Sequence, residues 1–128
     1  MATILVVDDS RTIRDILAYI LKLNNYEVDT ANDGLSALEK IYSSNYDLVI
    51  TDINMPKMDG YRLIKSIRKE KAYQYLPIII LTTEANEEDQ RKGIRLGADL
   101  YLVKPPNPDS LLAYIEMLIS GSRGRKAS

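Results

Sequence analysis

The chain has 128 residues, of which 45% are hydrophobic, and this size and apolar content fit one domain with a core of its own. Its 17 Lys and Arg residues nearly balance 18 Asp and Glu residues, so the net charge of -1 gives no general attraction to nucleic acid or to an anionic membrane. The absence of cysteine and histidine excludes disulfides, thiolate nucleophiles, Cys-based metal centres and histidine catalysis. Chemistry must therefore come from carboxylates, hydroxyls and amines.

No stretch of the sequence is apolar over the roughly 20 residues that a membrane-spanning helix needs. The N-terminus runs from Met1 into a short apolar segment, without the basic region or cleavage pattern of a signal peptide. We therefore expect a cytoplasmic protein that does not insert into a membrane and does not bind nucleic acid directly.

Short apolar runs rich in Val and Ile recur along the chain. They cover Thr3–Val7, Tyr26–Ala31, Leu48–Thr51, Pro77–Thr82 and Leu100–Val103. Most are continuous rather than alternating, which is typical of parallel strands that are buried on both faces.

Segments with helical spacing lie between several of these runs. Their apolar residues recur every three or four positions, at Ile13, Ile16, Leu17, Ile20 and Leu21, at Leu38 and Ile41, and at Leu63, Ile64 and Ile67. A last helix, with Pro108 in its first turn, is indicated by Leu111, Leu112, Ile115, Leu118 and Ile119. Strands that alternate with helices predict an α/β domain with a doubly wound, five-stranded parallel sheet, and the chain is too short for a barrel.

The predicted domain covers residues 1–120. The tail from residue 121 to 128 is small, polar and basic, and we expect it to be disordered. Whether this tail is native or the start of a linker is not decided by its sequence.

Polar residues follow four of the predicted strands, at the carboxyl edge where open α/β sheets bind ligands. Asp8 and Asp9 follow the first strand, Asp52 follows the third, and Thr82 and Lys104 stand at the ends of the fourth and fifth. If the first and third strands are neighbours, about 4.8 Å apart, the three carboxylates share one crevice and repel one another. A hard divalent cation with oxygen ligands usually relieves such repulsion, and Mg²⁺ is the expected metal.

Each acid alone has an ordinary structural explanation, because Asp often caps a helix or occupies a turn. The combination favours chemistry, since Lys104 brings a positive charge and Thr82 a hydroxyl donor to the same edge. Asp52 is then the natural nucleophile for a phosphoryl group, because carboxylates form acyl phosphates and the transfer needs mainly positioning and charge neutralisation.

Four spaced motifs, at residues 6–10, 48–60, 81–85 and 97–105, resemble those of response-regulator receiver domains of the CheY-like, chemotaxis type. The resemblance extends over about residues 3–119, so residues 1–120 are expected to form the receiver domain. It implies the flavodoxin-like strand order 2-1-3-4-5, in which the first and third strands are adjacent.

The resemblance also implies how the site works. Asp52 would be the phosphoacceptor, and Lys104 would pair with the acyl phosphate. Mg²⁺ would be bound directly by Asp9 and Asp52, by Asp8 largely through water, and by the backbone carbonyl of Asn54.

Thr82 and Tyr101 resemble the family's switch pair, in which the hydroxyl moves toward the phosphate and the aromatic ring turns inward. Without the resemblance, Tyr101 would be interpreted as a strand-edge aromatic that covers apolar surface. The sequence departs from the family at Pro106, where many members have an aromatic residue, and it leaves the isomer of the Lys104–Pro105 peptide open.

Asn54 and Glu84, each two positions beyond Asp52 and Thr82, are expected to border the path of the water that hydrolyses the acyl phosphate. The alternative interpretation is that both are solvated loop residues.

The implied function is that of a two-component response regulator, which is not an enzyme although it accepts and loses a phosphoryl group. Its partners would be a sensor histidine kinase or phosphotransfer protein and a downstream protein such as a motor component, in chemotaxis or motility signalling. The fourth helix, fifth strand and fifth helix would form the docking face. A receiver of a phosphorelay, a receiver of a longer regulator and a degenerate receiver that acts without phosphorylation are the alternatives.

Two other classes fit the sequence less well. A phosphatase of the haloacid dehalogenase type needs its nucleophile on the first strand, a second Asp two positions on and a cap over the substrate, whereas Asp8 and Asp9 are adjacent and no cap-sized insertion exists. A flavin or dinucleotide site needs a phosphate-binding loop after the first strand, where this chain has acids.

Overall fold

The computed structural model describes residues 1–127 and contains five βα units in sequence. In chain order its elements are β1 (Thr3–Val7), α1 (Arg11–Leu23), β2 (Glu27–Ala31), α2 (Gly34–Ser43), β3 (Leu48–Thr51), α3 (Gly60–Lys69), a short 3-10 helix (Lys71–Tyr73), β4 (Ile78–Thr82), α4 (Glu87–Leu96), β5 (Leu100–Val103) and α5 (Pro108–Ala127). All strand pairs are parallel, and the order across the five-stranded sheet is β2-β1-β3-β4-β5. The predicted fold class and strand order are confirmed.

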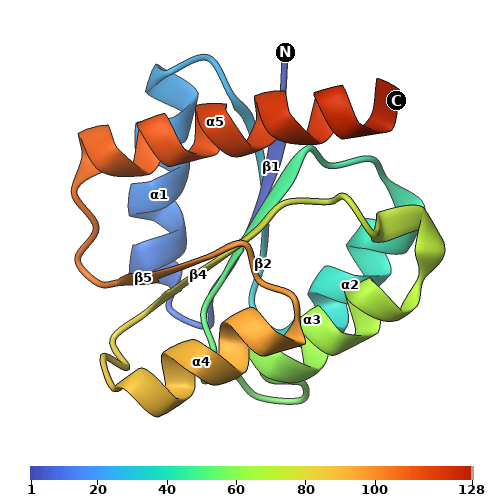
Figure 1. The fold of residues 1–128 in the computed structure, drawn as a ribbon. Helices are drawn as coiled ribbons and strands as arrows, with labels where there is room; N and C mark the ends of the chain where they lie inside the picture. Colours follow the sequence, from blue (N-terminus) through green and yellow to red (C-terminus); the bar gives the residue numbers. More distant parts are fainter. Residues whose placement is uncertain (128) are drawn as a thin grey trace.

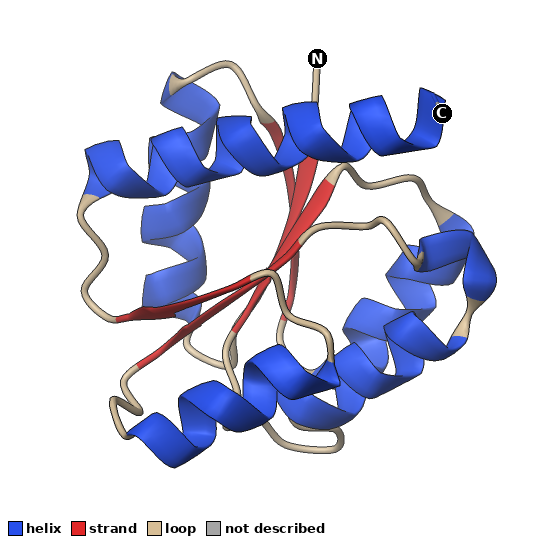
Figure 2. Ribbon diagram, in the orientation of Figure 1, coloured by secondary structure: helices blue, strands red, loops and turns tan. Residues whose placement is uncertain are grey.

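The sheet separates two layers of helices, with α1 and α5 on one side and α2, α3 and α4 on the other (Figures 1 and 2). Each layer has its own apolar cluster against the sheet. The residues of β3 and β4 are all buried, as are those of β1 after Thr3, because helices cover both faces. This burial explains why these strands are continuous apolar runs in the sequence.

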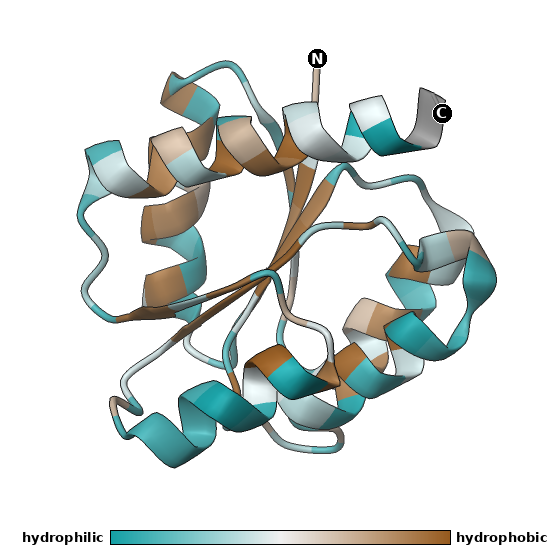
Figure 3. Cartoon of the chain, in the orientation of Figure 1, coloured by the Kyte–Doolittle hydropathy of each residue, from teal (hydrophilic) through white to brown (hydrophobic). Residues whose placement is uncertain are grey.

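The helix α4 differs from the others in its attachment to the sheet. Gly93 is its one buried residue, and the side chain of Ile94 is 49% exposed. Figure 3 accordingly shows α4 as largely hydrophilic. A helix without a buried apolar stripe carries little of the spacing by which helices are predicted, and the sequence showed no such pattern between residues 87 and 96.

The helix α5 continues to Ala127, whereas the sequence predicted a disordered tail from residue 121; residue 128 lies outside the described residues. Contacts far apart in the sequence support the added turns. Ser122 Oγ donates to the backbone oxygen of Tyr75 at 2.6 Å, and Arg123 lies 3.6 Å from the Asp47 carboxylate. Such tertiary contacts outweigh the low helix propensity of a segment that contains two glycines. Among the described residues, no helix is long and apolar enough to cross a membrane.

Candidate functional site

Three carboxylates meet at the carboxyl edge of the sheet. Since β1 and β3 are paired with Val7 opposite Thr51, the residues that follow these two strands lie side by side. Asp8, Asp9 and Asp52 each offer an oxygen atom, and these three atoms lie within 4.8 Å of one another. The predicted proximity of the three acids is therefore confirmed.

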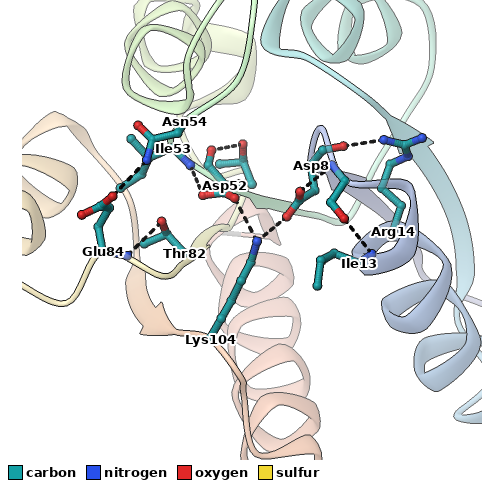
Figure 4. A network of polar contacts seen from close by, with 11 residues as sticks. Asp8, Ile13, Arg14, Asp52, Ile53, Asn54, Thr82, Glu84 and Lys104 are labelled. Atoms are coloured by element: carbon teal, nitrogen blue, oxygen red, sulfur yellow. Dashed lines mark hydrogen bonds and ion pairs between the residues drawn. The ribbon is translucent and has the colours of Figure 1, made fainter.

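Lys104 reaches into this cluster from the end of β5 and lies between two of the acids (Figure 4). Its Nζ atom donates to Asp8 Oδ2 at 2.7 Å and to Asp52 Oδ2 at 2.9 Å, and its side chain is only 12% exposed. Burial alone would lower the pKa of Lys104, but the hydrogen bonds and charges of Asp8 and Asp52 outweigh burial and raise it. Lys104 is thus held as a cation, and the peptide that follows it, Lys104–Pro105, is cis.

Asp52 is fixed by its own loop and by the start of α3. The Ile53 amide donates to Asp52 Oδ1 at 2.6 Å, so the second carboxylate oxygen turns toward Lys104. A Cβ atom at Gly60 would lie 2.2 Å from the backbone oxygen of Asp52. Glycine at residue 60 is therefore what allows α3 to begin so close to Asp52.

Asp8 is fixed in a similar way by residues that sequence reasoning missed. The Ser10 amide donates to Asp8 Oδ1 at 2.9 Å, and Arg14 Nη1 donates to the Asp8 backbone oxygen at 2.7 Å. Both carboxylate oxygens of Asp8 therefore have protein partners. Arg14 shows no motif in the sequence that would have marked it, because its partner is a backbone oxygen.

The donor set fits a hard cation such as Mg²⁺. It consists of carboxylate oxygens. Asp9 is exposed, and no hydrogen bond or ion pair from the side chains of residues 1–125 engages its carboxylate. An exposed, unengaged carboxylate beside two fixed ones leaves room for a cation that keeps several of its waters, as Mg²⁺ does.

Glu84 connects the remaining predicted residues in a chain of hydrogen bonds. Its amide donates to Thr82 Oγ1 at 3.3 Å, and its backbone oxygen accepts from the Tyr101 hydroxyl at 2.7 Å. Its carboxylate accepts from Asn54 Nδ2 at 3.2 Å. Asn54 and Glu84 are thus hydrogen-bonded to each other, and Thr82 is linked to Tyr101 through Glu84. The sequence predicted neither of these two connections. Burial, with the nearby charges of Asp89, Glu84 and Asp52, raises the pKa of Tyr101 to about 12.

The doubly wound sheet with a lysine and three carboxylates at its carboxyl edge agrees with the resemblance to receiver domains, and comparison with known proteins supports it. The family model for the response regulator receiver domain matches residues 4–116. The chain belongs to this family of signalling modules.

Solved structures of the same family superpose closely. The chemotaxis protein CheY4 of Vibrio cholerae has a TM-score of 0.86 and 42% sequence identity, over 92% of this chain and 98% of that one. The response regulator TrrA of Thermotoga maritima, solved in complex with Mg²⁺ and BeF, has a TM-score of 0.82 and 42% identity, over 92% of this chain and 99% of that one.

The transcriptional regulatory protein PhoP for alkaline phosphatase synthesis, from Bacillus subtilis, is a curated relative. It is 39% identical over 119 residues, which are 93% of this chain and 49% of PhoP. The chain thus spans about half the length of this relative.

Proposed function

We propose that Asp52 accepts a phosphoryl group, with Mg²⁺ bound, from a sensor histidine kinase or a phosphotransfer protein. The observation that supports this most is the meeting of Asp52 with Asp8, Asp9 and Lys104 in one crevice. The carboxylates can hold a cation, which together with Lys104 would attract an incoming phosphoryl dianion. The carboxylate of Asp52, the proposed nucleophile, already has a defined orientation.

In the proposed reaction, a carboxylate oxygen of Asp52 attacks phosphorus as the bond to the donor's histidine nitrogen breaks, and the leaving imidazole keeps the electron pair. Bound Mg²⁺ would neutralise charge on the phosphoryl oxygens and would be held by Asp9, Asp52, the backbone carbonyl of Asn54 and, through water, Asp8. Lys104 would exchange its bond to Asp52 for one to the phosphoryl group. Asn54 and Glu84 would border the path of the hydrolytic water.

Labelling with acetyl phosphate tests this proposal. We expect Mg²⁺ and acetyl phosphate together to add one phosphoryl group to the wild type, detected by intact-mass analysis and removed by hydroxylamine. Asp52→Asn should remain unmodified, whereas Asp15→Asn, at an exposed position of α1, should be labelled like the wild type. Equal labelling of Asp52→Asn and the wild type would remove Asp52 from the reaction.

The phosphodonor is proposed to dock along α1, where apolar side chains face solvent beside the site. Ile16, Tyr19 and Leu23 are 50%, 60% and 66% exposed. A groove of about 300 Å³ lies between α1 and the loop after β5, and Lys104 is among the residues that line it. A helix of the donor packed there could present its phosphohistidine to the crevice.

For the output we propose switching by Thr82 and Tyr101, followed by docking of a target on α4, β5 and α5. Exposed apolar residues on these elements are Ile94, Val103, Tyr114 and Met117. The similarity to a chemotaxis protein supports a role in chemotaxis or motility. A motor component is the target that we propose. The match covers only about half of PhoP, which favours a second candidate function, that of a receiver domain within a longer regulator. A cytoplasmic location is part of this proposal.

A further inference from the structure

The first two turns of α4 carry no apolar side chain and are contacted by tyrosine side chains of other elements. The residues from Glu87 to Lys92 are polar, Gly93 is buried, and Leu96 packs partly against the core at the far end of the helix. The segment next to the phosphoacceptor site therefore lacks the apolar stripe that usually holds a helix on a sheet.

Tyr61, the second residue of α3, provides one attachment for this segment. Its side chain is buried, and its hydroxyl donates to the backbone oxygen of Asp89 at 3.1 Å. The Lys92 ammonium lies 4.4 Å from the centre of the Tyr61 ring, which is a cation–π contact. Tyr61 thus contacts α4 in two ways, through its hydroxyl and through the face of its ring.

Gly93 provides a second attachment, because it lets the α4 backbone lie directly on the sheet and on Tyr101. A Cβ atom at this position would lie 2.5 Å from Cδ1 of Ile80 and 3.3 Å from Cδ2 of Tyr101. The Tyr101 ring is therefore seated against α4 while its hydroxyl holds the Glu84 carbonyl in the loop before that helix.

We infer that Tyr61 and Gly93 are positioning residues for the switch: together they hold α4 where the Tyr101 ring is seated against it. Their contacts set how easily α4 and the loop from Thr82 to Asn86 leave this arrangement. The inference deepens the proposed function and rests on it for the signalling consequence, because that loop is bonded to Thr82. The arrangement itself concerns the protein without a phosphoryl group.

Amide hydrogen exchange of the full chain, without Mg²⁺ or phosphodonor, tests the role of Tyr61. In Tyr61→Phe we expect exchange of the α4 amides to accelerate roughly fivefold, with α2 unchanged, since one partly buried hydrogen bond to the helix is lost. The matched control is Tyr73→Phe, because the Tyr73 hydroxyl donates to a backbone oxygen of α2, that of Ile41, at 3.2 Å. The control should leave α4 unchanged.

Gly93→Ala tests the second attachment, and the titration of Tyr101 is the readout. The added methyl group would lie 2.5 Å from Ile80 Cδ1 and 3.3 Å from Tyr101 Cδ2, so α4 should move away from both side chains and expose the Tyr101 ring. The pKa of Tyr101 should then fall from about 12 toward its ordinary value in an NMR titration of tyrosine rings. The pKa of Tyr46, also raised to about 12 by burial and by Asp29, should stay where it is and serves as the internal control.

The outcomes separate the inference from the proposed function. Unchanged α4 exchange in Tyr61→Phe, equal acceleration of all helices, or an unmoved Tyr101 titration in Gly93→Ala would each overturn the inference. No hydrogen bond or ion pair joins either residue to the Asp52 side chain, so both variants should be labelled by acetyl phosphate like the wild type. Failure to label the wild type would overturn the proposed function, while the exchange and titration results would still decide the inference.

Discussion

Lys104 donates to two carboxylates at once, so removing it affects both stability and metal affinity. In Lys104→Met, Asp8 and Asp52 face each other without a cation, and we expect the free energy of unfolding to fall by about 2 kcal/mol. Mg²⁺ binding should become tighter by about 1 to 2 kcal/mol, because the ammonium no longer competes for the same oxygens. Labelling by acetyl phosphate should nevertheless slow.

Urea unfolding with and without Mg²⁺ measures both effects of Lys104→Met. Lys40→Met is the matched control, because Lys40 also donates one short bond, at 2.7 Å, but to the backbone oxygen of Thr30. It should leave Mg²⁺ affinity unchanged. Weaker Mg²⁺ binding in Lys104→Met would mean that the lysine helps to build the metal site rather than competing with the metal.

Individual elements were predictable from the sequence to different degrees. The bounds of β1, β3 and β5 are as predicted, and β2 and β4 begin one residue later. The strands β1, β3 and β4 are buried on both faces and show as continuous apolar runs, whereas β2 and β5 lie at the edges of the sheet and are only partly buried. The helix α4 gave no such signal, since its one buried residue is Gly93, which has no side chain. The end of α5 was mispredicted because its support, Ser122 on Tyr75, lies 47 residues away in the sequence.

The candidate site was predictable where it depends on side chains at strand ends. The meeting of Asp8, Asp9 and Asp52 follows from the adjacency of two parallel strands. The contacts of Arg14 and of the Glu84 main chain were not predictable, because a backbone acceptor has the same chemistry at every residue and leaves no mark in the sequence.

The loop between β3 and α3 contains a strained residue. Lys57 has a φ of 66°, in the left-handed region that lysine rarely adopts and asparagine tolerates better. We expect Lys57→Asn to raise the free energy of unfolding by about 0.5 to 1 kcal/mol. The lost ion pair with Asp33, at 3.9 Å and with a lysine side chain that is 69% exposed, should matter little.

Equilibrium urea unfolding measures the effect of Lys57→Asn. Lys65→Asn, in the exposed middle of α3, is the control and should destabilise slightly because asparagine is a poorer helix former than lysine. A decrease in stability for Lys57→Asn would show that the ion pair outweighs the backbone strain.

If the phosphodonor docks on the exposed apolar face of α1, a substitution there should slow phosphoryl transfer from a protein donor. Ile16→Ser should slow transfer from a phosphorylated histidine phosphotransfer protein at least fivefold, a loss of about 1 kcal/mol of binding, with unchanged labelling by acetyl phosphate. Leu35→Ser is the control, since Leu35 is 43% exposed on α2, in the other helical layer. Equal rates for both variants would remove α1 from the docking surface.

At the scale of the whole molecule, the hydroxyls of buried and partly buried tyrosines set the alkaline limit of stability. Burial first, and nearby carboxylates second, raise the pKa of Tyr46 and Tyr101 to about 12, and the pKa of Tyr61 is raised as well. These rings ionise near pH 10 in the unfolded chain, so the unfolded state loses their protons first. Stability should therefore be level up to about pH 10 and fall steeply between about pH 10 and 12.

Denaturant midpoints at pH 8, 10 and 11 measure this loss, and Tyr46→Phe should flatten the decrease, because phenylalanine has no proton to lose. A midpoint that does not change up to pH 11 would contradict the raised pKa values. Because the chain has no histidine, no histidine titration changes its stability between pH 6 and 8.

The parallel sheet also gives the molecule an electrical polarity. Because every strand runs the same way, α1, α2, α3 and α4 all begin near the carboxyl edge, with the side chains of Ser10, Asp33, Asp59 and Asn86 capping their first turns. The partial positive ends of four helix dipoles therefore face the edge that carries Asp8, Asp9 and Asp52. Their field offsets part of the repulsion among these carboxylates, and it points the same way for any anion that approaches the crevice from solvent.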